Sequence, residues 1–456
     1  MKGSTKFALA LPAVLLCSAA ASSAAVVGVF HKNLVAGPQS IFVFGAEGTT
    51  GTMVRGADTT AFTIDSTGVY TFSLGTSGNS MQTGGAVNNL SFRIDADKPI
   101  SATALNRANA STDQTNLLDV EALGRDYVVL TTTGEFGDGS QMSVTAIEDG
   151  TEVSIRSPVA LNGNPADTPF TVTLNKGESV FYTSGAGSDL SGARVTANKD
   201  IAVFAGAECT QVPVGVYACD HIISQQYSVD NFDTKFVVSN SYGNGPLGDL
   251  VRVTGATDGT EVFMNGVSKG IINAGQVLTI DAGNGGVLTA SQPVTVGQFL
   301  RGQGERQAGI GDPAYEIIPS TDQFLSSYAF TTPVGDDAFT LNYLSLGLLA
   351  GDAGTLKWNG SLVDTSAFTS IGGWLLGTLS IGVGYGTIEA ANPFLATISG
   401  YSSYDSYFST IATSFSPGVS PPVDPPVAPV PLPAGLPLLG VALGVLGLMR
   451  SKRRAV

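Results

Sequence analysis

Apolar side chains alternate with small or polar side chains along much of the chain. This period of two is typical of strands that bury one face, and it is clearest at residues 62–64, 69–72, 143–147, 151–155 and 170–174. The body shows no amphipathic helical pattern of comparable length. The alternation therefore predicts an all-β protein built from short antiparallel strands.

Three sequence markers recur along the body in the same order. Residues 149–153 reappear letter for letter at 258–262, with a degenerate copy at 352–356. The second marker is a short segment that begins at Ala96, Ala197, Ala290 and Ala390. The third marker is a glycine that opens an apolar run, at Gly68, Gly177, Gly275 and Gly373. Successive copies lie about 100 positions apart, which predicts four repeats of one structural unit.

Each repeat contains enough strand segments for one two-sheet sandwich. The sequence therefore predicts tandem antiparallel β-sandwich repeats over residues 26–115, 116–210, 211–310 and 311–412. A large β-propeller made of half-repeats is the alternative, because a four-stranded blade is about half as long as these repeats. Asp149 and Gly150 form the residue pair preferred in two-residue hairpins, so we expect the strands beside them to pair.

The N-terminal residues predict export. Lys2 and Lys6 precede an apolar run at residues 7–16, and a stretch of small residues then offers a cleavage site at 23–25. We expect residues 1–25 to form a signal helix that the mature chain lacks. Near the other end, residues 413–429 are rich in proline and predict a stiff, extended spacer. A disordered linker without a spacing role is the alternative.

The last residues, 430–456, combine a short motif, an uncharged apolar segment and a basic end. The motif is Val430, Pro431, Leu432, Pro433 and Ala434. The apolar segment, predicted as a single helix, is short for a hydrocarbon core that needs about 20 residues, and the cations favour the cytoplasmic side. This tail resembles the VPLPA type of PEP-CTERM sorting signals. The resemblance implies membrane contact before processing and a transient exosortase-like partner. An ordinary single-span anchor is the alternative.

Composition narrows the classes of partner. The formal net charge is −15, which disfavours binding to the phosphates of nucleic acids. Only 13% of the residues are charged, whereas 43% are hydrophobic and 57 are glycine. These values indicate packed strands joined by tight turns, and they argue against a disordered chain.

Two cysteines remain once the signal segment is removed, Cys209 and Cys219. An exported chain meets an oxidising compartment, so we predict that they form a disulfide, which contributes about 2–3 kcal/mol. The alternative is a catalytic thiol at Cys219 beside His221, but the sequence offers no third, orienting group. With His31 the only other histidine, a site of several imidazoles cannot form, and we predict no metal and no cofactor.

The repeated turns and the cysteine loop supply the remaining candidate residues. Asp149 and Asp258 could bind Ca²⁺ as hard oxygen ligands, although turn formation accounts for both. The loop closed by the cysteines holds Tyr217 and is followed by Asp220 and His221. Because loops often carry binding residues, these three are candidate contact residues. In the alternative, Asp220 and His221 only tie neighbouring strands together.

Residues 95–345 resemble the N-terminal domain of IgG Fc-binding proteins, a family domain that also occurs in bacterial surface proteins. The resemblance rests on residues 122–127, 189–192, 202–206, 209–221 and 311–313. It implies a β-rich fold and a surface role, and it transfers no ligand-binding residue.

Together these patterns predict an exported, non-enzymatic protein of a Gram-negative cell surface or extracellular matrix. Its role would be adhesive or structural, with extracellular polysaccharide or surface proteins as partners. The alternatives are a carbohydrate-binding module and an envelope-polymer hydrolase. An aromatic strip around Trp358 and Trp374 would favour the first alternative, and a cleft converging on His221 would favour the second.

Overall fold

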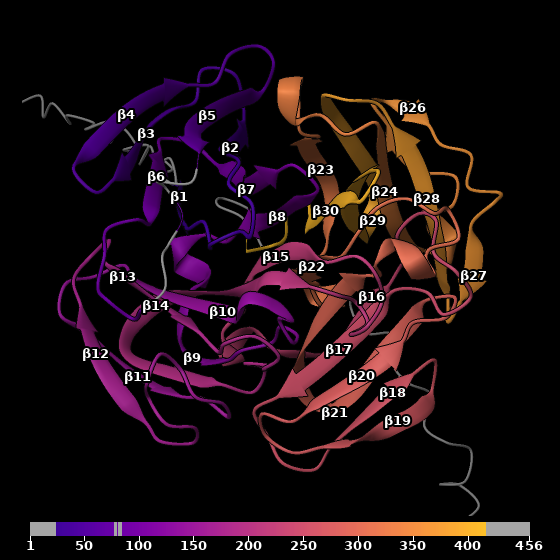
Figure 1. Ribbon diagram of the computed structural model, residues 1–456. Coiled ribbons are helices and arrows are strands. Elements are labelled where there is room, and N and C mark those ends of the chain that lie inside the picture. Colours follow the sequence, from indigo (N-terminus) through magenta and orange to yellow (C-terminus); the bar gives the residue numbers. More distant parts are fainter. Residues whose placement is uncertain (1–23, 77–79, 81–83, 416–456) are drawn as a thin grey trace, which may run out of the picture. The chain divides into compact units, whose positions relative to one another are not determined.

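The computed structural model describes residues 24–76, 80 and 84–415 (Figure 1). These residues form thirty strands and six short 3-10 helices, with no α-helix among them. The predicted all-β antiparallel fold is confirmed. No helix in the described part of the chain is long and apolar enough to cross a membrane. The predicted signal segment (apart from its last two residues), the sorting motif and most of the spacer lie outside the described residues.

In the structure we assign the strand that follows each long strand to the same repeat, so the repeats end later than the predicted bounds at 210 and 310. The second repeat shows how one unit is built. Its long strand β14 (Arg194–Thr210) is shared by two sheets. The first half of β14 pairs with β9 (Gly124–Val128) and β11 (Thr151–Arg156), and the second half pairs with β10 (Phe136–Ala146) and β15 (Asp220–Gln225). Strands β12 (Phe170–Leu174) and β13 (Ser179–Thr183) complete the two sheets.

The third repeat has the same order, with β21 (Gly286–Leu300) as its long strand. Its other strands are β16 (Asp233–Val238), β17 (Leu250–Gly255), β18 (Thr260–Met264), β19 (Val267–Ile272), β20 (Val277–Asp281) and β22 (Ala314–Ile317). The fourth repeat is built around β29 (Tyr385–Ser402). Its other strands are β23 (Leu325–Thr331), β24 (Leu341–Leu349), β25 (Lys357–Trp358), β26 (Ser361–Leu362), β27 (Thr369–Ile371), β28 (Trp374–Ile381) and β30 (Asp405–Thr410).

In the first repeat the long strand is interrupted. It is divided into β6 (Phe92–Ala96) and β7 (Ile100–Ala108), which belong to different sheets. The other strands are β1 (Ala24–Gly28), β2 (Pro38–Gly45), β3 (Thr50–Arg55), β4 (Asp58–Thr63), β5 (Val69–Thr76) and β8 (Ser111–Leu117). The alanine marker of the sequence therefore lies where each long strand passes from one sheet to the other.

Each repeat contains most of one apolar cluster, and the clusters of the first and fourth repeats also include side chains of a neighbouring repeat, such as Phe181 and Phe42. The four clusters are centred on Ile94, Val144, Val253 and Leu344, all of them fully buried. Alternation places one face of each strand in the core, as predicted. The four repeats nevertheless belong to one compact unit. The 3-10 helices lie in the connections, at η1 (Val120–Ala122), η2 (Val229–Asn231), η3 (Gln303–Glu305), η4 (Thr321–Gln323), η5 (Gly335–Asp337) and η6 (Ala350–Asp352).

The Asp-Gly marker is not the hairpin that the sequence suggested. Strands β10 and β11 do not pair with each other, and each pairs with β14 on a different sheet. The turn between them instead crosses from one sheet to the other, with Gly150 at φ 64°. The hydroxyl of Thr151 donates to the carbonyl of Glu148 at 2.7 Å. The hydroxyls of Thr49, Thr260 and Thr355 likewise donate to the carbonyl three residues earlier. Because Thr49 lies in the first repeat, that repeat also contains this turn.

The glycine marker lies where one repeat meets the previous one. The carbonyl of Gly177 accepts a hydrogen bond from the Ser91 hydroxyl of the first repeat at 2.8 Å. Gly275 lies against Gly192, and Gly372, beside the marker, lies against Val287. Gly68 of the first repeat lies against Tyr385 of the fourth. A turn at this marker therefore contributes to each boundary between neighbouring repeats, including that between the first and the fourth.

Two predicted boundaries fall inside ordered structure. Ala24 and Ala25, assigned to the signal segment, belong to β1 and pair with Ala96 and Asp95. At the other end, the carbonyl of Phe415 accepts a hydrogen bond from the backbone N–H of Asp119 at 2.8 Å. The body therefore extends into the first residues of the predicted spacer.

Candidate functional site

One strand from each repeat meets its counterparts at a common centre, which we call the central junction: β8, β15, β22 and β30 (Figure 1). Each of these strands contacts the next, and β30 contacts β8. None of the described strand pairings joins two of them. Each therefore ends its own sheet, with backbone groups that need other partners.

Polar side chains of neighbouring repeats supply those partners. The buried carboxylate of Asp113 on β8 accepts hydrogen bonds from four backbone N–H groups. They belong to Gln114, Ile223, Tyr315 and Phe408, at 2.9, 3.1, 3.1 and 3.3 Å. Three of these donors lie on β15, β22 and β30, so one side chain links all four repeats.

Four more acids lie buried around Asp113. They are Asp220, Asp312, Glu316 and Asp405, each at most 3% exposed. Burial raises the pKa of Asp312 to about 7, helped by the charge of Asp405, and burial raises that of Asp405 to about 6. Burial also raises the pKa values of Asp220 and Glu316 well above the usual range. No group of three or more His, Cys, Asp or Glu side chains in the described residues could hold a metal ion.

Both histidines lie inside the protein. His31 Nε2 lies 2.8 Å from the hydroxyl of Ser143, and His221 Nε2 lies 3.3 Å from the Asn106 amide. Burial lowers the pKa of His221 to about 4 and that of His31 well below 6.5. Both imidazoles are fully buried and neither Nδ1 has a hydrogen-bond partner among the described residues. A Ser-His pair is therefore present without an orienting carboxylate or access for a substrate.

The predicted disulfide between Cys209 and Cys219 is confirmed, with Cα atoms 5.3 Å apart. It closes the connection between β14 and β15. The loop packs on the third repeat, because Gly302 N–H donates to the Val212 carbonyl at 2.8 Å and Gly304 N–H donates to the Tyr217 carbonyl at 3.1 Å.

The structure separates the three candidate contact residues. Tyr217 is 71% exposed, whereas Asp220 and His221 are fully buried. Asp220 Oδ1 accepts from the backbone N–H of Thr112 at 2.6 Å and thereby ties β15 to β8. Tyr217 has two exposed apolar neighbours in this region: Val214 lies in the same loop and is 60% exposed, and the Tyr404 ring meets that of Tyr217 edge-on with centroids 6.0 Å apart.

Comparison with family models matches residues 113–400, more than half of the chain, to the family described as IgGFc binding protein. The chain belongs to the IgGFc-binding protein family. The matched region begins at Asp113 and includes the disulfide loop. Most of the first repeat of this IgGFc-binding family member precedes the match.

The curated human IgGFc-binding protein is 29% identical over 258 residues. The alignment covers 54% of this chain and only 5% of the human protein. Both names refer to binding and neither to catalysis, which is consistent with a non-enzymatic role. A solved structure described as a Ca²⁺-stabilized adhesin that helps an Antarctic bacterium reach out and bind ice is 14% identical, over 86% of this chain and 94% of that one. Its TM-score is 0.11, too low to support any argument about fold or function.

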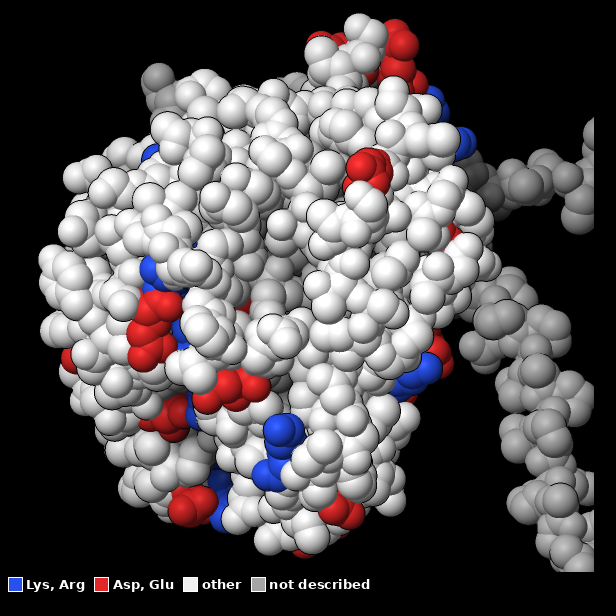
Figure 2. All heavy atoms as spheres, turned by 90° about the vertical axis from the view of Figure 1, so that its right-hand side faces the viewer, with Lys and Arg blue, Asp and Glu red and all other residues white. Residues whose placement is uncertain are grey.

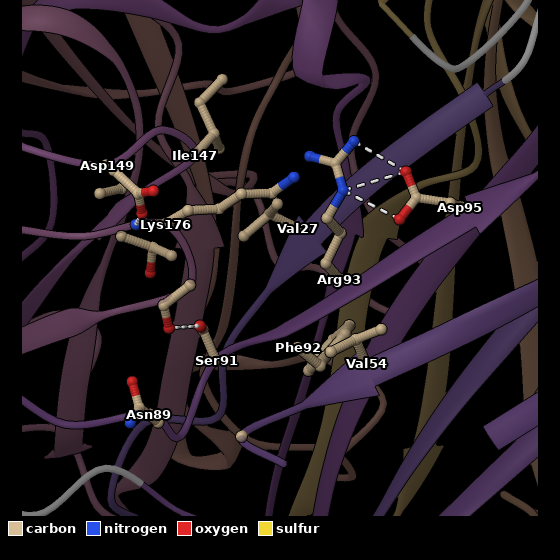
Figure 3. A pocket seen from close by; sticks show the side chains of 14 residues that line it. Val27, Val54, Asn89, Ser91, Phe92, Arg93, Asp95, Ile147, Asp149 and Lys176 are labelled. Carbon is tan, nitrogen blue, oxygen red and sulfur yellow. Dashed lines mark hydrogen bonds and ion pairs between the residues drawn. The ribbon is translucent and has the colours of Figure 1, made fainter. Parts of the chain in front are cut away.

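A cleft of about 460 Å³ lies between the first and second repeats of this family member (Figure 3). Its floor includes Val27, Val54 and Ile147, and its polar lining includes Asn89, Arg93, Asp95, Asp149 and Lys176. This volume suits a small ligand. The sequence markers gave no sign of the cleft, because its residues come from separate segments.

The two tryptophans do not form an exposed strip. Trp374 is 6% exposed and meets Phe324 edge-on, with ring centroids 5.9 Å apart. Trp358 packs against the core of the fourth repeat, 5.6 Å from the ring of Phe330. Arg301 is also buried, at 2% exposed, and its Nε donates to the Gly248 carbonyl at 2.6 Å.

Proposed function

We propose that this chain is an exported, non-enzymatic protein of a Gram-negative cell surface or extracellular matrix, with an adhesive or structural role. The main support is the disulfide-closed loop, which presents Val214 and Tyr217 to solvent from a body of packed sheets. Exposed aromatic and aliphatic side chains on a rigid support are suited to contact with polymers or proteins. The buried histidines give no support for a hydrolase.

The sparse surface charge agrees with such a role. Figure 2 shows one face on which charged side chains occur singly or in small groups, separated by wide uncharged areas. Contacts on a surface of this kind depend little on charge steering and therefore little on salt. We expect adhesion to persist at raised ionic strength.

Adhesion can be tested with the complete chain displayed by its host bacterium. Replacing Val214 and Tyr217 by serine should lower attachment to matrix-coated surfaces several-fold. The matched control replaces Val267 and Ile271, two equally exposed apolar residues on the outer strand β19, and should keep attachment near the original level. Equal attachment by both double variants would exclude the loop as the contact site.

Delivery to the surface forms the second part of the proposal. The motif at residues 430–434 and the basic end at 450–454 support recognition by an exosortase-like enzyme. Removing residues 430–456 should leave the body folded but shift it between envelope and medium fractions. Unchanged location and unchanged processing after truncation would contradict exosortase-type sorting.

A further inference from the structure

The cleft between the first two repeats holds two cations that face each other. Arg93 lies on β6, and Lys176 lies in the turn between β12 and β13. Figure 3 shows the Lys176 side chain extended across the cavity with its amine turned toward the guanidinium of Arg93. Two cations that face one another repel, so an anion between them would be stabilised by both.

Neighbouring carboxylates leave the space between the cations open. Asp95 accepts hydrogen bonds from Nε and Nη2 of Arg93 at 2.7–3.0 Å, and Figure 3 shows it on the side of Arg93 away from Lys176. Asp149 Oδ1 accepts from the backbone N–H of Lys176 at 2.9 Å. Among the described residues, none forms a hydrogen bond or ion pair with the Lys176 amine or with Nη1 of Arg93.

The other boundaries between repeats lack this pair. The residues that correspond to Lys176, each directly before the marker glycine, are Thr67, Ala274 and Gly372. The residues that correspond to Arg93, each three before the marker alanine, are Arg194, Val287 and Thr387. The Arg194 guanidinium forms an ion pair with Asp126, and the residue that corresponds to Lys176 in the next repeat is an alanine. Among these corresponding positions of the described residues, only the boundary of the first two repeats carries two cations.

We propose that this cleft binds a hexuronate residue of an acidic polysaccharide. The carboxylate of the sugar accepts hydrogen bonds from Lys176 and Nη1 of Arg93. Its hydroxyl groups donate to Asp149 and bond to the Asn89 amide, while an apolar face of the ring lies on Val54 and Ile147. A hexuronate carries one carboxylate and several hydroxyl groups, which match the cationic and the other polar side chains that line the cleft. The inference adds a sugar site to the proposed adhesive role, on a surface separate from the disulfide loop.

The test measures binding of a galacturonate oligomer to the complete chain by calorimetry. Replacing Lys176 by alanine should weaken binding about tenfold, because one charge-assisted hydrogen bond is lost. Lys176→Arg should restore most of the affinity, and Lys176→Glu should abolish binding. Lys269→Ala removes an equally exposed lysine on β19 and should leave affinity unchanged. Lys176 lies in an exposed turn, so these variants should fold normally.

Three outcomes would overturn the proposal. The complete chain could fail to bind the galacturonate oligomer. It could bind a neutral galactose oligomer equally well, which would remove any role for the cations. Lys176→Ala and Lys269→Ala could weaken binding equally, which would indicate nonspecific charge attraction.

Loss of adhesion in the Val214 and Tyr217 variant with unchanged oligomer binding would support both proposed sites. Unchanged adhesion in that variant would reject the loop and leave the cleft supported.

Discussion

The four repeat cores and the central junction are both buried, but the junction contains many more polar side chains. Each core consists of aliphatic and aromatic residues, most of them from the sheets of one repeat. The junction instead contains carboxyl, amide and hydroxyl groups contributed by all four repeats. The four junction strands each end a sheet, so side chains of neighbouring repeats must accept the hydrogen bonds of the backbone N–H groups on these strands. Apolar burial therefore stabilises each repeat and also joins neighbouring repeats, whereas specific hydrogen bonds align their end strands at the junction.

The largest effect should come from removing the carboxylate that links all repeats. Asp113→Ala leaves four buried N–H groups without an acceptor. Each unsatisfied group costs about 1–3 kcal/mol, so we expect a loss of at least about 4 kcal/mol in the free energy of unfolding, measured in urea. Hydrogen exchange should show faster exchange at Ile223, Tyr315 and Phe408, in three different repeats.

A core substitution gives the matched comparison. Leu344→Ala creates a cavity inside the fourth repeat and should cost about 2–5 kcal/mol. Its faster exchange should be concentrated in the fourth repeat. If Asp113→Ala loosened only the first repeat, the junction would not couple the repeats as proposed.

This contrast also explains how much could be predicted from the sequence. The alternation at residues 143–147 and 151–155 predicted strands with one buried face, because burial of that kind leaves a local signature. The junction leaves none: residues 111–117 are almost entirely polar, yet β8 is fully buried. Its partners lie about 100 or more positions away along the chain. The disulfide at Cys209 could be predicted from local spacing, whereas the cleft at Lys176 depends on how two repeats dock.

The second test uses the pH dependence of the junction. The folded pKa of Asp312, about 7, lies above its ordinary value of 3.8. Its stabilising contribution is therefore complete below about pH 4 and is lost as pH rises through about 7. The amide of Asp312→Asn stays neutral at every pH. Between pH 5 and pH 8 the free energy of unfolding of this variant should therefore rise by about 2–4 kcal/mol relative to that of the original protein. Urea unfolding across this range measures the difference.

An exposed carboxylate supplies the control with the opposite sign. Hydrogen bonds from the Thr50 backbone and hydroxyl lower the pKa of Asp97. Its stabilising contribution is present at neutral pH and disappears as pH falls through the folded pKa. Asp97→Asn should therefore be less stable than the original protein at pH 7, and the difference should shrink below pH 4. Parallel trends for Asp97→Asn and Asp312→Asn would mean that burial at the junction does not set the pH dependence.

A smaller effect is expected at the disulfide loop, which lies outside the repeat cores. Replacing Cys209 and Cys219 by serine removes a short closed loop and should cost about 2–3 kcal/mol. A reducing agent should lower the stability of the original protein to that of the variant and leave the variant unchanged. Continued slow exchange at Phe408 would show that the junction survives loss of the disulfide. Fast exchange there would instead make the disulfide part of the same cooperative contact.

The smallest effect should arise at the turn that joins the two sheets of one repeat. The buried hydroxyl of Thr260 donates to the Thr257 carbonyl at 2.9 Å. Thr260→Val keeps the shape of the side chain and removes one hydrogen bond, so the expected loss is about 1 kcal/mol. Thr260→Ser should recover much of it because the donor returns. The corresponding change Thr49→Val in the first repeat should have a similar cost, since its bond is 2.7 Å long. A much larger loss in only one of the two repeats would show that this turn also contributes to docking between repeats, and that its role is not confined to a single sandwich.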